Sequence, residues 1–257
     1  MVKRDYCTKN TGELKTFDNY IPGSLNLKSI FLYPYRELRG MWTVIIILLI
    51  GAYLLGSIPF GGIISRAVIR LDITKAGSGN IGATNVAREV GIKWGVITLV
   101  ADALKGFIPV ALARYVFASS TDTGEALAGI VGILALLGHQ FPIYNRFKGG
   151  KGIATGLGIF LALSPISCLF SGIVFVVVVI LWGYVSLGSI LAALSVPLWL
   201  YIAGHSAFLI VLSLIVCVLI TFRHRGNIQR LLQGDERKWH KGGYLNRSTK
   251  RPRSSSE

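Results

Sequence analysis

The sequence predicts an all-α membrane protein with seven transmembrane helices, its N-terminus outside the cell and its C-terminus in the cytoplasm. Mean hydropathy is +0.58, and only 15% of the residues are charged. Between Gly152 and Arg223 there is no Asp, Glu, Lys or Arg. One membrane span needs about 20 apolar residues, so this interval must cross several times. Residues 173–182 are continuously apolar rather than alternating, which argues against a β-barrel.

The predicted spans follow the apolar runs in chain order. These runs begin near Trp42, Val96, Ala126, Ile153, Ile166, Leu187 and Phe208. The run at residues 153–163 extends only about 16 Å, whereas the hydrocarbon layer is about 30 Å thick. Taken alone it could be a re-entrant half-helix. It crosses only if the bilayer thins around it or protein covers its ends.

The distribution of charge decides the topology. Residues 65–93 carry five basic side chains, 145–152 carry three, and ten Lys or Arg follow Phe222, whereas 118–125 carry two acids and no base. The positive-inside rule places the basic segments in the cytoplasm. An even number of crossings must then join residue 152 to residue 223, and the apolar length favours four. The net charge of +15 therefore has a topological explanation, and we expect no nucleic-acid partner.

The chain divides into three predicted regions. Residues 1–40 are polar and lack a signal peptide's apolar run, and Met41 directly precedes the first span. We interpret 1–40 as a polar extension that is either a gene-model artefact, and so outside the native protein, or a poorly ordered appendage. Residues 41–240 form the membrane domain, and 241–257 a basic disordered tail near anionic lipid. The three cysteines show no metal or redox spacing.

The first polar motif is the glycine-rich segment 76–85, which lies between two apolar runs. It contains the letters of the dinucleotide fingerprint G-x-G-x-x-G, but a membrane helix and a basic connector precede it instead of a strand. Glycines still allow backbone N–H groups to approach an anion. The candidate ligands of this segment, with the arginine one turn later, are Gly77, Ser78, Gly79, Asn80, Gly82, Thr84, Asn85 and Arg88.

A second glycine turn follows the third apolar run, and a third polar group closes the last one. In the second turn, Gly152 stands where the Walker A loop of ATPases has the Ser or Thr that binds magnesium, so ATP hydrolysis is not expected. The second turn comprises Lys148, Gly149, Gly150, Lys151 and Gly152, with His139 before it; the third group contains His224 and Asn227. Asp102 and Lys105 lie inside the second span, where they form either a structural ion pair or part of the site. The three polar motifs all fall on the cytoplasmic side of the deduced topology.

These motifs, in this order and spacing, resemble the PlsY family of acyl-phosphate-dependent glycerol-3-phosphate acyltransferases of bacterial membranes. The resemblance covers about residues 41–236 and rests on the sequences GSGNIGATN at 77–85, GH at 138–139, FKGGKGIAT at 147–155 and RHRGN at 223–227. It implies a multi-pass protein of the bacterial plasma membrane with a cytoplasmic active site. The substrates would be acyl phosphate and glycerol 3-phosphate. No His shows the H-x4-D spacing of acyl-CoA-dependent acyltransferases; position 144, for His139, is Tyr.

Acyl phosphate carries a good leaving group, so catalysis can rest on positioning and charge stabilisation without a covalent intermediate. The resemblance implies that the catalytic residues binding the phosphates and glycerol are Ser78, Arg88, Lys148, His224 and Asn227. The other candidates named above are interpreted as substrate-binding. The general base stays open among His139, His224 and a substrate phosphate oxygen. We expect no cofactor, no metal site and a monomer.

A different class of protein remains as the alternative. An organophosphate transporter would also use glycine-broken helices around an anion site. It predicts polar groups near mid-span and access from both sides. The motifs here gather at one face instead.

Overall fold

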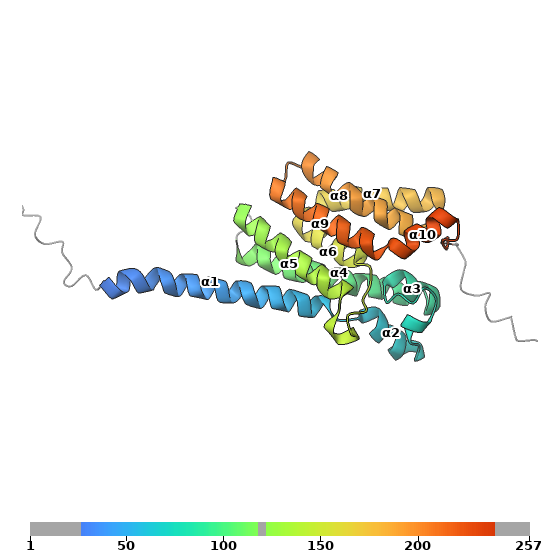
Figure 1. The fold of residues 1–257 in the computed structure, drawn as a ribbon, viewed down its shortest axis with the longest axis horizontal. Helices are drawn as coiled ribbons and strands as arrows, with labels where there is room; N and C mark the ends of the chain where they lie inside the picture. The colour runs from blue at the N-terminus through green and yellow to red at the C-terminus, as the bar shows by residue number, and fades with distance from the viewer. Residues whose placement is uncertain (1–26, 118–121, 240–257) are drawn as a thin grey trace, which may run out of the picture. The chain divides into compact units, whose positions relative to one another are not determined.

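The computed structural model describes residues 27–117 and 122–239 (Figure 1). Within these ranges the regular elements are helices, and no strand is present. The prediction of an all-helical protein is therefore confirmed for the described part. Residues 1–26 of the predicted extension and the predicted tail at 241–257 lie outside it.

Each of the seven predicted apolar runs lies in a helix. In chain order they are α1 (Leu27–Gly56), α4 (Ile92–Val116), α5 (Asp122–Gln140), α6 (Ile153–Leu163), α7 (Pro165–Trp182), α8 (Val185–Ile202) and α9 (Ala207–Arg223). The first helix begins at Leu27, ahead of the apolar run at Trp42. The chain divides into two units between Val44 and Ile45, within α1, and the helices from α2 onward belong to the second unit.

Length and hydropathy qualify five helical stretches of the described residues as membrane spans: 40–69, α4, 124–145, α7 and α8. The helix α9 qualifies together with α10 (Arg225–Gln233), which follows a 60° bend at His224. The helix α6 has only 11 residues, as its short apolar run predicted. Pro165 then starts α7 directly after Ser164, a position where proline's missing N–H costs nothing.

Glycines let the central helices touch. A Cβ at Gly106 of α4 would collide with the carbonyl oxygen of Thr155, and one at Gly158 of α6 with that of Ala103. Small residues at such crossings allow the close backbone approach on which helix association in membranes depends. Residues of α4, α5, α6 and α9, among them Val110 and Leu136, complete a common buried core. The short α6 is thereby held at the centre of the bundle.

The connecting segments carry the shorter elements. These are α2 (Phe60–Ile69), the 3-10 turn η2 (Ile73–Lys75), α3 (Ala83–Glu89), the 3-10 turn η3 (Ile143–Asn145) and α10. In Figure 1, α2, α3 and α10 lie at the same end of the helical bundle. A small cluster of Ile73, Ile81 and Val86 fixes the α2–α3 connection. The polar segments predicted to converge therefore meet at one end of the bundle.

Candidate functional site

A polar cavity of about 350 Å³ lies where three connecting segments meet the bundle. Its walls come from the glycine-rich segment and α3, from the second glycine turn, and from the bend between α9 and α10, with α4, α5, α7 and α8 behind them. Among the predicted site residues, those that line it are Gly77, Ser78, Asn80, Gly82, Thr84, Asn85, Arg88, Asp102, His139, Lys151, Gly152, His224 and Asn227.

The glycine-rich segment is held in shape by its own amides. The buried Asn85 accepts a hydrogen bond from the N–H of Ser78 (3.0 Å) and donates to the carbonyls of Ala76 and Asn80 (3.0 and 2.9 Å). The side chain of Asn80 in turn accepts from the N–H of Gly82 at 2.8 Å. These bonds occupy the Asn85 amide, so its direct role is to fold the loop that presents Ser78 and Arg88.

The second glycine turn is fixed through its carbonyl groups. Arg223 donates from Nε to the carbonyl of Gly150 (3.1 Å) and from Nη2 to that of Gly149 (2.7 Å). The buried Gln140 donates to the carbonyl of Lys151 at 3.1 Å. A side chain at Gly149 or Gly150 would collide with His139. The glycines of this turn therefore serve close packing, and Arg223 holds the turn in place through two of its carbonyl groups.

The two lysines of this turn lie in different surroundings. Lys151 lines the cavity, whereas Lys148 is exposed and, with Gly149 and Gly150, does not line it. Burial lowers the pKa of Lys151 to about 8; Glu236 opposes this shift, and Arg230, Arg88 and Arg223 add to it. A partly desolvated ammonium among other cations is well placed to gain from an anionic ligand.

The bend after α9 supplies the third wall. The Nδ1 atom of His224 lies 2.8 Å from the carbonyl oxygen of Ile220 and must donate to it, which leaves Nε2 of the neutral ring as an acceptor. Asn227 and Arg230 donate to the two carboxylate oxygens of Glu236 at 2.7 and 2.8 Å. Burial acts to raise the pKa of Glu236, but these hydrogen bonds outweigh it and hold that pKa below its usual value.

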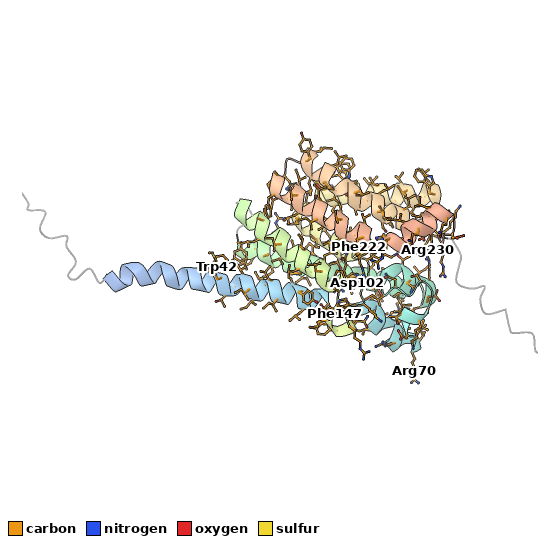
Figure 2. All side chains as sticks on the ribbon, viewed as in Figure 1. Trp42, Arg70, Asp102, Phe147, Phe222 and Arg230 are labelled. Atoms are coloured by element: carbon orange, nitrogen blue, oxygen red, sulfur yellow. The ribbon has the colours of Figure 1, made fainter. Side chains whose placement is uncertain are left out.

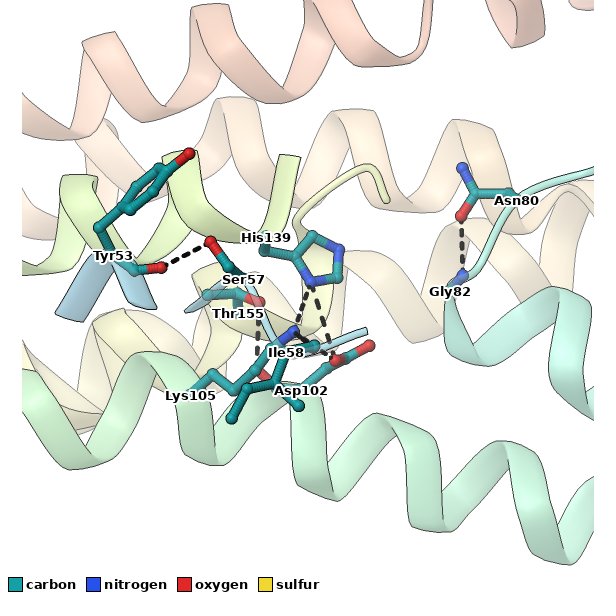
Figure 3. A network of polar contacts seen from close by, with 9 residues as sticks. All are labelled: Tyr53, Ser57, Ile58, Asn80, Gly82, Asp102, Lys105, His139 and Thr155. Atoms are coloured by element: carbon teal, nitrogen blue, oxygen red, sulfur yellow. Dashed lines mark hydrogen bonds and ion pairs between the residues drawn. The ribbon is translucent and has the colours of Figure 1, made fainter. Parts of the chain in front are cut away.

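Beneath the cavity lies a buried polar network (Figure 3). The Nζ atom of Lys105 forms an ion pair with Asp102 (2.9 Å) and lies 2.7 Å from the carbonyl of Ile58 and 3.2 Å from Nδ1 of His139. Since an ammonium has only donors, Nδ1 of His139 accepts and its proton sits on Nε2. Lys105 does not line the cavity. Of the two alternatives for Asp102 and Lys105, the ion pair is present, and Asp102 also lines the cavity. The network joins the α1–α2 connection to α4 and α5.

The cavity favours anions. Its two carboxylates, Asp102 and Glu236, are matched by Lys105 and Arg230. The lining also contains Arg88, Lys151 and Arg237, so its Lys and Arg side chains outnumber its carboxylates. Cations in a partly desolvated cleft attract phosphate groups more strongly than they do in water. Arg70, by contrast, is exposed, points away from the bundle in Figure 2 and does not line the cavity.

A second, apolar cavity of about 540 Å³ adjoins the polar one. It extends between α4, α6, α7, α8 and α9. The residues that line both cavities are Ala83, Thr84, Leu99, Ile153, Phe175, Val185 and Ser189. An amphiphile with an anionic head and an aliphatic tail would place its head–tail junction at this border.

Sequence reasoning missed several residues of the polar cavity, namely Ser186, Ser189, Arg230, Glu236 and Arg237. Glu236 carried a usable signal, because it is one of few acids in a strongly basic C-terminal region. A carboxylate there needs cationic or amide partners, and Asn227 and Arg230 provide them. Gly79, predicted to bind substrate, does not line the cavity.

Comparisons with known proteins point to one family. The family model described as glycerol-3-phosphate acyltransferase matches residues 46–234. The glycerol-3-phosphate acyltransferase of Syntrophotalea carbinolica is 48% identical over 193 residues, covering 75% of this chain and 96% of that protein. The protein of the same name from Aquifex aeolicus is 43% identical over 192 residues, covering 75% of this chain and 97% of that protein.

Solved structures agree with these relatives. A crystal structure of PlsY (YgiH), an integral membrane glycerol 3-phosphate acyltransferase, in its glycerol 3-phosphate form has a TM-score of 0.73 and 42% identity. It covers 77% of this chain, which covers 96% of that one. The lysophosphatidic acid form of the same enzyme gives a TM-score of 0.71 at the same identity and coverage.

Proposed function

The chain belongs to the glycerol-3-phosphate acyltransferase family, and we propose that it acylates glycerol 3-phosphate with an acyl phosphate as donor. The products are lysophosphatidic acid and inorganic phosphate, so the reaction is the first acylation of phospholipid synthesis. The observation that carries this proposal is the shared border of a cationic polar cavity and an apolar cavity. The comparisons give no support to the alternative of an organophosphate transporter.

The two cavities match the phosphate and the fatty chain that the acyl phosphate and the lysophosphatidic acid each contain. Arg88, Lys151 and Arg237 neutralise the phosphates of donor and acceptor in the polar cavity. The fatty chain of the donor occupies the apolar cavity, where each buried methylene contributes about 0.8 kcal/mol. The carbonyl carbon of the acyl phosphate then lies at the border, within reach of the glycerol hydroxyl. Binding both substrates at this border supplies the proximity that a reaction with a good leaving group needs.

Acyl transfer forms one bond and breaks another. The 1-hydroxyl oxygen of glycerol 3-phosphate bonds to the acyl carbon, the bond from that carbon to the phosphate oxygen breaks, and phosphate leaves with both electrons. His224 lines the cavity and Nε2 is the acceptor of its neutral ring, so this residue can take the hydroxyl proton. His139 is less suited to that role, because its Nδ1 accepts from Lys105 and its Nε2 faces Gly150. A phosphate oxygen of the substrates is the competing proton acceptor.

His224→Gln distinguishes these proton acceptors. Glutamine can hydrogen-bond the hydroxyl but cannot take its proton. If His224 is the base, kcat should fall by about a hundredfold, within the range of general-base catalysis, with little change in the KM for glycerol 3-phosphate. Retention of most of the kcat would assign the proton to a phosphate oxygen instead.

The helices also suggest how the protein sits in the membrane. We infer seven spans, formed by α1, α4, α5, α6, α7, α8 and α9, with the N-terminus outside and the C-terminus in the cytoplasm. This arrangement is supported by the basic segments at the end of the bundle that carries the cavity. The site then faces the cytoplasm of a bacterial cell, at its plasma membrane. We also propose that the enzyme is a monomer.

The test of this function uses purified protein in detergent, with palmitoyl phosphate and labelled glycerol 3-phosphate. We expect labelled lysophosphatidic acid that depends on both substrates. A matched assay follows glycerol 3-phosphate uptake into protein-containing vesicles. Uptake without any lysophosphatidic acid would refute the proposal in favour of transport.

A further inference from the structure

Two glycines on the walls of the apolar cavity have no packing partner that requires them. Within the described helices α4 to α9, a Cβ would come closer than 3.0 Å to a neighbour at most glycines, for example at Gly95 and Gly158. At Gly156 of α6 the nearest atom would be Cδ1 of Ile220, at 3.4 Å, an ordinary contact. At Gly172 of α7 it would meet nothing within 4 Å.

Both glycines line the apolar cavity. Glycine in a helix interior is less favourable than alanine, and at Gly172 no close helix contact compensates for this cost. Glycine is also the residue that lets another molecule approach the backbone closely. The space that the two missing side chains leave is therefore suited to a ligand, not to a neighbouring helix.

The two glycines lie at corresponding depths. Gly156 follows Ile153 by three residues and Gly172 precedes Phe175 by three, which is about 4.5 Å along each helix axis. Ile153 and Phe175 both line the border between the two cavities. On α8, Ser189 is a third residue that lines both cavities. Ala192 follows it by three residues and lines the apolar cavity. Gly156, Gly172 and Ala192 are thus small wall residues close to the border, on three helices that pack against one another.

From this arrangement we propose that Gly156, Gly172 and Ala192 form a neck that sets the width of the acyl path one helical turn beyond the reacting carbon. The proposal rests on the proposed function and adds a specificity determinant to it. The neck admits an extended, unbranched aliphatic chain into the apolar cavity. A side chain added at the neck occupies the space of the chain's methylenes, while the polar cavity keeps its phosphate contacts.

The test compares the wild-type protein with Gly172→Leu and with Gly51→Leu as a matched control. Gly51 is also a helical glycine whose Cβ would meet nothing within 4 Å, but it lines neither cavity. The measured quantity is kcat/KM for a series of acyl phosphates from butyryl to palmitoyl. In the wild type we expect kcat/KM to rise with chain length, since each added methylene is buried.

In Gly172→Leu, displacement of about two methylenes should lower kcat/KM for palmitoyl phosphate about tenfold, and the rise with chain length should flatten. The KM for glycerol 3-phosphate should stay within about twofold of the wild-type value, and Gly51→Leu should follow the wild-type series. A Gly172→Leu series parallel to that of the wild type would overturn the proposal. Wild-type protein that transfers no acyl group from any acyl phosphate would instead refute the proposed function.

Folding of each variant is checked by the rise in Tm that glycerol 3-phosphate produces. If Gly172→Leu shows no such rise, Gly156→Leu becomes the deciding variant, because its Cβ also fits without a clash. The same flattened series is then expected. A series from Gly156→Leu that parallels the wild type would overturn the neck.

Discussion

Removal of the Lys151 charge should damage turnover far more than removal of the neighbouring Lys148 charge. The two lysines belong to one glycine turn, but only Lys151 lines the polar cavity. With a pKa of about 8, Lys151 is mostly protonated at neutral pH. A hydrogen bond from a charged group contributes about 1.5–3 kcal/mol. Lys151→Ala should therefore lower kcat/KM for glycerol 3-phosphate by about tenfold to more than a hundredfold.

Two variants control for other effects of losing a positive charge. Lys148→Ala removes the same charge from an exposed position of the same turn, and Arg70→Ala removes one from a segment outside the cavity. Both should stay within about threefold of wild-type kcat/KM, because exposed charges contribute little. Orientation should be unchanged in all three variants, as reporters fused to the C-terminus would show, since the other basic residues still set it. The reasoning fails if folded, correctly inserted Lys148→Ala is as impaired as Lys151→Ala.

Four further outcomes follow from the site. Because the pKa of Lys151 is lowered to about 8, its ammonium form is lost as pH rises through that value, and kcat/KM should decline above about pH 8. In Lys151→Arg, the pH–rate profile should show this decline moved to higher pH. Asp102→Asn leaves the ammonium of Lys105 buried without its counter-charge and should destabilise the protein by about 3–5 kcal/mol. The Tm should fall accordingly, and an unchanged Tm would exclude a structural ion pair. The donor should be acyl phosphate alone, so purified acyl-CoA or acyl carrier protein thioester should give no lysophosphatidic acid; comparable turnover with either would contradict the proposed donor. Protein expressed from Met41 should keep its activity, since the family match begins at residue 46, and loss of folding or activity would show that residues 1–40 are required.

Much of the helical framework could be predicted from the sequence. Apolar runs and basic connectors are strong signals because an unpaired charge or backbone group in hydrocarbon is costly. These signals located the helices, including the short α6, and correctly predicted that three polar motifs lie at one end of the bundle. The break between α1 and α2 and the bend at His224 were not predicted.

The roles of individual side chains were harder to predict. Lys148 and Lys151 look alike in the sequence, but Phe147 and Gly152 both have positive φ (60° and 89°), which settles where the turn points its side chains. The hydrogen bonds from Gln140 and Arg223 to carbonyl groups of the turn depend on the packing of α5 and α9, which the sequence alone does not give. Asn85 could likewise bind substrate or fold its own loop, and only its contacts assign it to the loop.

The central claim is that the protein transfers the acyl group of an acyl phosphate directly to glycerol 3-phosphate and releases the phosphate. The most direct measurement uses purified protein, unlabelled glycerol 3-phosphate and palmitoyl phosphate carrying heavy oxygen in the bond between acyl carbon and phosphate. The account predicts one lysophosphatidic acid for each phosphate released, with the heavy oxygen in the phosphate. Release of phosphate without lysophosphatidic acid, or retention of the heavy oxygen in the lipid ester, would contradict it.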